Sequence, residues 1–246
     1  MRVGAILLVF LLAVPARAAD AINVAVASNF SRAAAELAEQ FEAETGLAVR
    51  LSIGSTGKLY AQILNGAPFD VFLAADTARP ARLERSGHAV AGTRFTYATG
   101  SLVLWSRSAR DCLAALTDDG AGHVALANPE TAPYGKAAVE FLATAGYWES
   151  VSARAVYGEN INQALQFAAT GNAAIGIVAR SQLTAPQLPA ATCTWVVPAA
   201  SSTGLEQQAV LLQRAADNAN ALRFFEFLGT DRARATIRRH GYELAR

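Results

Sequence analysis

Two consecutive stretches of this chain repeat one pattern, in which an apolar strand ends in a short polar turn that opens a helix. The two strands are residues 22–27 (INVAVA) and 48–53 (AVRLSI), and a third apolar strand follows at 69–75 (FDVFLAA). Strands that alternate with helices in this way form parallel sheets with right-handed crossovers. The pattern therefore predicts an α/β fold whose ligands bind beyond the carboxyl ends of the strands.

The first helix start gathers several hydrogen-bond donors at one point. Ser28 and Asn29 follow the first strand directly, and we predict that one of them is the N-cap, because its side-chain oxygen can accept a bond from a first-turn N–H. The apolar face of this helix consists of Phe30, Ala34, Leu37 and Phe41. Such a start suits an anion, since free N–H groups meet the positive end of the helix dipole there. The plain alternative is an ordinary helix cap.

Three further helix starts carry similar small polar or backbone donors, at Ser55-Thr56, Tyr134-Gly135 and Asn160-Ile161. Two of the four starts precede a long extended stretch, 94–106, and two follow it. This stretch is broken by Gly100 and could carry the chain between two lobes. If the lobes face each other, all four starts can converge on one cleft. Their donors are neutral, which suits a fully ionised oxyanion.

A protonated anion would also need a carboxylate acceptor in the cleft. Asp70, Asp76 and Glu159 are the acids near these starts, and we place none of them inside.

The remaining pattern continues the alternation of strands and helices. We expect helices at 58–64, 80–85, 111–116, 136–145, 161–170, 219–228 and 231–240, and strands at 123–127, 153–157, 174–179 and 194–197. The strand at 194–197 could carry the chain back to the first lobe. We assign no strand between 198 and 218.

Residues 1–19 read as a secretory signal peptide. Arg2 precedes an apolar run from Val3 to Val14, and small residues at Ala16 and Ala18 mark a cleavage site after Ala18 or Ala19. The alternative is an uncleaved anchor, but the run is short for a membrane span.

The net charge and the cysteine content indicate which partners and which cysteine state to expect. The formal charge is +1, and no basic stripe appears, which argues against nucleic acid as a partner. Cys112 and Cys193 enter an oxidising compartment, so a disulfide is slightly favoured over two separate buried thiols.

Signatures of an enzyme are absent. The three histidines, His88, His123 and His240, have no nucleophile or metal-ligand partner at a telling spacing. No GxSxG, HExxH, P-loop or CxxC motif occurs. We therefore predict no catalytic residues and no cofactor.

Several motifs together resemble one family. VAVASNF, GSTGKLYAQILNGAPFDVFLAAD, RFTYATGSLVLWS, NPETAPYGKAA, GENINQAL and AIGIVA, in this order, are similar to the periplasmic molybdate-binding proteins of bacterial ABC transporters. The resemblance runs from about Ile22 to Leu244. It implies a type II periplasmic-binding fold, with lobe I formed by 20–97 and 199–246 and lobe II by 98–198.

The resemblance also implies the ligand residues. The molybdate-binding set falls on Ser28, Asn29, Thr56, Tyr134 and Ile161, with Ser55 as an additional candidate. The molybdenum is then held only as its oxyanion, without direct protein ligands to the metal. Some members use a Tyr after the GIV strand, where this chain has Ala179, a departure that leaves a fifth ligand open and favours the subgroup that uses Asn29.

The expected function is capture of molybdate, and of tungstate, in the periplasm and delivery to a membrane permease by a monomeric protein. Two alternatives stand beside it: a binding protein for another oxyanion such as sulfate, or a periplasmic enzyme built on the same two-lobed frame.

Overall fold

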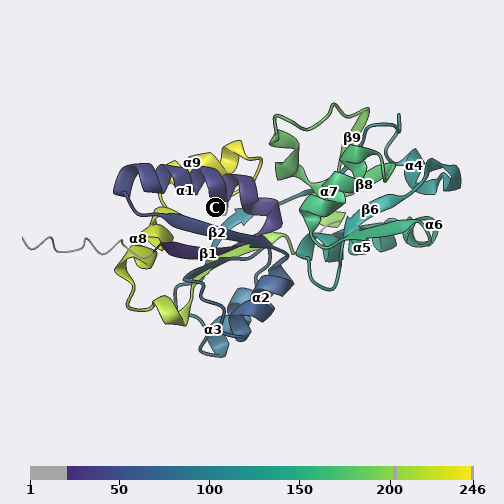
Figure 1. Cartoon of the computed structure of the whole chain (residues 1–246). Helices are drawn as coiled ribbons and strands as arrows, with labels where there is room; N and C mark the ends of the chain where they lie inside the picture. Colours follow the sequence, from purple (N-terminus) through teal and green to yellow (C-terminus); the bar gives the residue numbers. More distant parts are fainter. Residues whose placement is uncertain (1–20, 202–203, 245–246) are drawn as a thin grey trace, which may run out of the picture.

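The computed structural model describes residues 21–201 and 204–244, which form two lobes, each built on a five-stranded sheet flanked by helices (Figure 1). We call them lobe I and lobe II in the order in which the chain enters them. This α/β, two-lobed architecture confirms the predicted fold class. The predicted signal peptide, 1–19, lies outside the described residues. No helix in the described part of the chain is long and apolar enough to cross a membrane.

Lobe I takes its sheet from both halves of the chain. Its strands are β1 (Ile22–Ala27), β2 (Val49–Gly54), β3 (Val71–Leu73), β4 (Phe95–Thr99) and β10 (Glu206–Leu211), in the order β2-β1-β3-β10-β4. β1 is parallel to β2 and β3, whereas β10 is antiparallel to β3 and β4. The helices are α1 (Ser31–Thr45), α2 (Thr56–Leu64), α3 (Ala78–Arg85), α8 (Ala219–Phe227) and α9 (Asp231–Arg239). The carboxyl ends of β1 and β2 therefore lie side by side.

Lobe II is formed by the middle of the chain. Its strands are β5 (Leu102–Ser106), β6 (Val124–Ala127), β7 (Ala155–Gly158), β8 (Ile175–Ala179) and β9 (Cys193–Val196), in the order β7-β6-β8-β5-β9. β6 is parallel to β7 and β8, and β5 is antiparallel to β8 and β9. The helices are α4 (Ala114–Thr117), α5 (Pro133–Thr144), α6 (Trp148–Ser152) and α7 (Ile161–Thr170).

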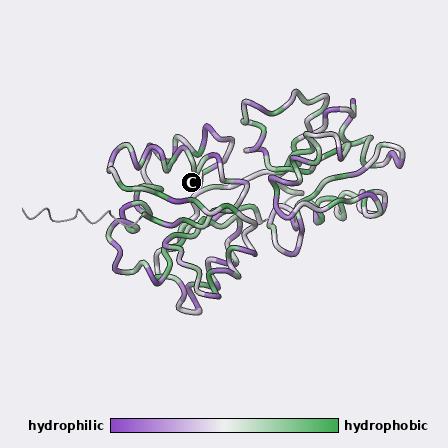
Figure 2. The backbone as a smooth tube through the Cα atoms, in the orientation of Figure 1, coloured by the Kyte–Doolittle hydropathy of each residue, from purple (hydrophilic) through white to green (hydrophobic). Residues whose placement is uncertain are grey.

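Helix α1 packs on the lobe I sheet through the apolar face predicted from its spacing. Phe30, Leu37 and Phe41 are all buried. The ring of Phe41 lies 5.2 Å from that of Phe224 and 5.5 Å from that of Phe227, both on α8. Hydrophobic residues gather on the strands inside each lobe (Figure 2). The burial of such faces is what holds each lobe together.

Two neighbouring segments connect the lobes. One joins β4 to β5 through Gly100, and the other joins β9 to β10. The two run side by side, because the N–H of Gly100 donates to the carbonyl of Leu205 at 2.9 Å. The break at Gly100 in the extended stretch is thus a crossover between lobes, as expected.

The predicted helix cap at Ser28-Asn29 is wrong. The chain first forms a short 3-10 helix, η1 (Ser28–Phe30), and no side chain caps either η1 or α1. The side-chain NH2 group of Asn29 donates to the distant residues Gln207 and Tyr242 instead.

Three helices begin earlier than the sequence pattern indicated. α2 starts at Thr56 rather than Lys58, α3 at Ala78 rather than Pro80, and α5 at Pro133 rather than Lys136. Proline suits the first helical position, because its fixed φ matches the helix and its missing N–H is not needed there. The earlier starts place the backbone N–H groups of Thr56 and Tyr134 in first turns.

Strand β10 has no counterpart in the sequence-based assignment. It pairs with β3 and β4 in the middle of the lobe I sheet. β9, expected to return the chain to lobe I, pairs with β5 and belongs to lobe II. Cys112 and Cys193 form a disulfide that attaches β9 to the segment before α4, with a Cα–Cα distance of 5.7 Å.

Candidate anion-binding site

Four helix starts from the two lobes converge on one small cavity. Lobe I contributes η1 and α2, and lobe II contributes α5 and α7. The cavity is lined by Ala27, Ser28, Asn29, Ser55, Thr56, Ala75, Ala132, Pro133, Tyr134 and Ile161. It leaves about 10 Å³ of room for the centre of a water-sized sphere, so it suits one small compact solute rather than an organic substrate. All six residues singled out from the sequence are brought together here.

The hydroxyl groups of lobe I are available to a ligand. The Ser55 side chain is buried, and its Oγ atom has no hydrogen-bond partner. Ser28 is also buried, and its hydroxyl forms no hydrogen bond with any described residue. Thr56 Oγ1 accepts a bond from the N–H of Ala75 at 3.2 Å, which leaves its own proton to donate. A buried polar group without a partner costs about 1–3 kcal/mol, so these oxygens indicate a place for a solute.

Backbone N–H groups complete the donor set. Across the described residues, no hydrogen bond is donated by the N–H of Thr56, Tyr134 or Ile161. Asn160 caps α7 by accepting from the N–H groups of Asn162 and Gln163, as its position predicted, and this leaves the N–H of Ile161 unused. Each of these groups is one of the orphan donors that every helix start presents.

Gly135 explains how closely α5 approaches the end of β6. A Cβ atom at this position would lie 2.2 Å from the carbonyl oxygen of Ala127, so only glycine fits. The close approach aims the start of α5, with the N–H of Tyr134, at the carboxyl end of the lobe II strands. Tyr134 thus supplies a backbone donor, and Gly135 supplies the space that lets the start of α5 approach the end of β6.

The cavity is neutral, since none of its lining residues carries a charged side chain. The three nearby acids all have other partners. Asp70 accepts from the N–H of Asn23 and pairs with Arg214, while Asp76 pairs with Arg79. Glu159 forms a solvent-exposed ion pair with Lys58 that joins the two lobes at 2.7 Å. A dianion would therefore meet donors and helix dipoles but no competing carboxylate.

Asn29 lines the cavity, yet its side-chain amide is already used. Nδ2 donates to Gln207 Oε1 at 2.8 Å and to Tyr242 Oη at 3.1 Å. The carbonyl oxygen of Asn29 accepts bonds from Tyr242 Oη at 2.7 Å and from Ser181 Oγ at 3.2 Å. In this arrangement only the backbone N–H of Asn29 is left for a solute.

Ala179, which stands where some family members have a Tyr, does not line the cavity. Its N–H donates to Gln182 Oε1 at 2.9 Å. Gln182 in turn donates to the carbonyl of Ile161 at 3.1 Å, and so supports the start of α7 from behind. No cluster of three or more metal-ligating side chains occurs among residues 21–201 and 204–244.

Sequence reasoning missed the polar residues that surround the cavity. Gln207 and Tyr242 hold Asn29, and Thr131 contacts α2 from the opposite lobe. The only local signal was the pair of glutamines in EQQAVL, at a place where we assigned no strand.

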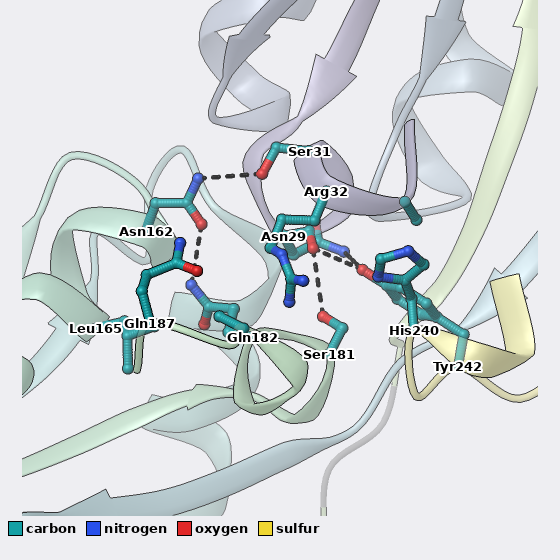
Figure 3. Close-up of a pocket in the computed structure, with 12 residues that line it drawn as sticks. Asn29, Ser31, Arg32, Asn162, Leu165, Ser181, Gln182, Gln187, His240 and Tyr242 are labelled. Atoms are coloured by element: carbon teal, nitrogen blue, oxygen red, sulfur yellow. Dashed lines mark hydrogen bonds between the residues drawn. The ribbon is translucent and has the colours of Figure 1, made fainter. Parts of the chain in front are cut away.

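A second and larger pocket lies behind η1, between the lobes (Figure 3). It has a volume of about 250 Å³, and its lining includes Arg32, Gln187 and His240. Three hydrogen bonds cross between the lobes beside it. They run from Asn162 Nδ2 to Ser31 Oγ at 3.4 Å, from Ser181 Oγ to the Asn29 carbonyl (Figure 3), and from Arg32 Nη1 to Thr184 Oγ1 at 2.9 Å. The lobes are therefore in contact on both sides of the small cavity.

Comparisons with known proteins agree on one kind of protein. The sequence profile of the family described as bacterial extracellular solute-binding protein matches residues 22–243. The molybdate-binding protein ModA of Azotobacter vinelandii is 45% identical over 95% of this chain and 94% of its own length. ModA of Rhodobacter capsulatus is 43% identical over 98% of this chain and 96% of its own. The solved structure of the Azotobacter vinelandii periplasmic molybdate-binding protein aligns with a TM-score of 0.86 at 38% identity, covering 92% of this chain and 100% of that one.

Proposed function

Because this chain belongs to the bacterial extracellular solute-binding proteins, we propose that it binds molybdate between its two lobes. The chain captures the anion in the periplasm as a monomer and delivers it to an ABC permease. Tungstate, a tetrahedral dianion of the same kind, is bound as well. The members of this family are solute-binding proteins, so the role is binding rather than catalysis.

The observation that carries this proposal is the set of unused donors around the small neutral cavity. The hydroxyls of Ser28 and Ser55 have no partner among the described residues, and three first-turn N–H groups are likewise free. Hydrogen bonds to an ionised acceptor contribute roughly 1.5–3 kcal/mol each. Five to seven of them support micromolar to nanomolar binding after the costs of association.

We assign the roles residue by residue. Ser28 donates through its hydroxyl, and Asn29 through its backbone N–H. Thr56 donates through both groups, with the Ser55 hydroxyl beside it. Tyr134 and Ile161 donate through the backbone from the opposite lobe. The anion thus contacts both lobes and holds them closed.

The absence of a carboxylate among the lining residues favours a fully ionised dianion over a protonated phosphate. Sulfate satisfies the same chemistry, so it is the second candidate ligand. Discrimination between sulfate and molybdate must come from size. The Mo–O bonds of molybdate are longer than the S–O bonds of sulfate, so molybdate needs the more widely spaced donors.

The experiment is an anion-dependent thermal shift of the mature chain with molybdate, tungstate, sulfate and phosphate. A bound ligand raises the melting temperature in proportion to RT ln(1 + [L]/Kd). We expect molybdate and tungstate to raise it by several degrees at concentrations where sulfate and phosphate have no effect. An equal shift with sulfate would refute the assignment to molybdate.

A further inference from the structure

Gln207 is a buried amide to which the proposed function assigns no role. It lies on β10, next to the crossover segments, and its exposed fraction is 0%. A buried amide is costly unless its donors and acceptor are satisfied. The partners that satisfy Gln207 belong to both sides of the candidate anion site.

On the side of lobe I, Gln207 holds Asn29. Its Oε1 atom accepts from Asn29 Nδ2 at 2.8 Å and from Tyr97 Oη at 3.1 Å. Because Asn29 is the second residue of η1, this bond fixes the turn that presents the Ser28 hydroxyl and the Asn29 N–H to the cavity. Gln207 and Asn29 are 178 residues apart in the sequence.

On the side of lobe II, Gln207 holds Tyr134. Its Nε2 atom donates to Tyr134 Oη at 3.1 Å. The ring of Tyr134 therefore extends from the start of α5, where its N–H faces the cavity, to the crossover between the lobes. Gly100 leaves room for it: a Cβ atom at Gly100 would lie 1.9 Å from Tyr134 Oη.

We propose that Gln207 is a positioning residue, which sets the spacing between the donors of lobe I and lobe II by bonding Asn29 and Tyr134 at once. This inference rests on the proposed function and deepens it, because donor spacing is what can separate molybdate from the smaller sulfate. One neutral amide suits the task, since it accepts on one side and donates on the other without placing a charge beside a dianion. The hydroxyl groups around it stay protonated, as burial raises the pKa values of Tyr97 and Tyr134 well above their usual range.

The test compares Gln207→Leu and Tyr134→Phe with Gln208→Leu. Tyr134→Phe removes only the hydroxyl and keeps the backbone N–H at the cavity. Gln208 is the matched control on the same strand, because it bonds Arg94 and Thr96 on lobe I and does not line the cavity. The affinities for molybdate and sulfate are measured by calorimetry, and the melting temperature is measured without ligand.

We expect the first two variants to weaken molybdate binding by roughly tenfold or more, the equivalent of one lost buried hydrogen bond. We also expect the ratio of molybdate to sulfate affinity to fall in both and to stay unchanged in Gln208→Leu. A purely structural role would lower the melting temperature and leave that ratio intact. An unchanged ratio in both variants overturns this inference alone, whereas a wild-type chain that does not bind molybdate overturns the proposed function.

Discussion

The backbone N–H of Gly57 donates to the carbonyl oxygen of Thr131 at 2.8 Å, and this bond joins α2 of lobe I to the loop before α5 of lobe II. The preceding residue, Thr56, presents its own N–H to the cavity. Consecutive N–H groups of one helix start thus point to the candidate anion and to the opposite lobe. In our proposal, anion binding and closure of the lobes therefore depend on the same turn.

Gly57→Ala should therefore hinder closure without altering any donor. A Cβ atom there would lie 2.9 Å from the Thr131 oxygen and 3.0 Å from Arg79 Nη2. Relieving such crowding typically costs about 1–3 kcal/mol, so we expect molybdate affinity to fall by roughly five- to hundredfold, as measured by calorimetry. Gly229→Ala is the control, because its Cβ would contact only the Glu226 oxygen, at 3.4 Å. Equal affinity in the two variants would exclude this role for Gly57.

Ser28→Ala combined with Thr56→Ala should remove two hydroxyl donors from the cavity. With roughly 1.5–3 kcal/mol for each bond to a charged acceptor, the expected loss is about 3–6 kcal/mol, a Kd increase of at least a hundredfold. The control is Ser86→Ala with Thr117→Ala, whose hydroxyls bond to the carbonyls of Leu83 and Ala114 outside the cavity. Retained affinity in the double variant would show that the anion binds elsewhere.

Ser55→Ala should separate ligand binding from stability. Its hydroxyl is buried without a partner, so removing it should leave the unliganded melting temperature unchanged or slightly higher. The rise in melting temperature on adding molybdate should shrink. Ser106→Ala is the opposite case, because Ser106 does not line the cavity and its Oγ atom bonds the carbonyl of Ala174 and the N–H of Ala109. That variant should lose stability and keep its rise in melting temperature on adding molybdate. A stability loss in Ser55→Ala with full ligand response would contradict our interpretation of this hydroxyl.

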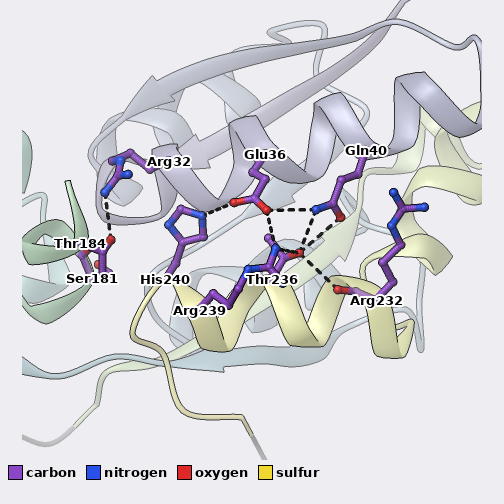
Figure 4. A network of polar contacts seen from close by, with 9 residues as sticks. All are labelled: Arg32, Glu36, Gln40, Ser181, Thr184, Arg232, Thr236, Arg239 and His240. Atoms are coloured by element: carbon purple, nitrogen blue, oxygen red, sulfur yellow. Dashed lines mark hydrogen bonds and ion pairs between the residues drawn. The ribbon is translucent and has the colours of Figure 1, made fainter. Parts of the chain in front are cut away.

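Glu36 should make stability depend on pH through the contact between α1 and α9 (Figure 4). The hydrogen bond from His240, and then that from Arg239, lowers the pKa of Glu36 below its usual 4.5. Its contribution is therefore present above about pH 4.5 and is lost as the pH falls through the lower, folded-state pKa. Because the side chain is 37% exposed, we expect no more than roughly 1 kcal/mol.

The measurement is urea unfolding of Glu36→Gln against wild type from pH 3 to 8. The difference in unfolding free energy should be present at neutral pH and should vanish in acid. Glu39→Gln is the control, since Glu39 is exposed on the same helix and forms no ion pair among the described residues. A difference that grows as the pH falls would reverse the sign we predict.

The disulfide should stabilise lobe II. It closes a segment with a sequence separation of 81, for which loop entropy gives an upper value of about 4–5 kcal/mol. Replacing both Cys112 and Cys193 by Ser should therefore lower the melting temperature markedly under oxidising conditions. Because neither cysteine lines the cavity, molybdate affinity well below that temperature should not change. Unchanged stability would indicate that β9 is held by its pairing with β5 alone.

The local parts of the site were predictable from the sequence. A strand, a polar turn and a helix start are encoded within a few residues, so the local pattern alone places Ser28 and Thr56 at the carboxyl ends of strands and Tyr134 and Ile161 at helix starts. Their convergence also required the crossover at Gly100, which the break in an extended stretch indicated. The roles of these residues as ligands remain our proposal.

The parts that were not predictable depend on long-range contacts. Gln207 lies on a strand that we did not assign, and its bond to Asn29 has no signature within either segment. The same bond orients the amide of Asn29 toward Gln207 rather than toward the first turn of the helix, where no side chain forms a cap. The contact of Gly57 with Thr131 exists only because two lobes meet, which no local pattern encodes.

The most direct test of the central claim is a calorimetric titration of the mature wild-type chain with molybdate and, separately, with sulfate. We predict one molybdate per chain, with a Kd in the micromolar to nanomolar range, and sulfate binding at least a hundredfold weaker. No heat of binding with molybdate, or equal affinity for sulfate, would contradict the account.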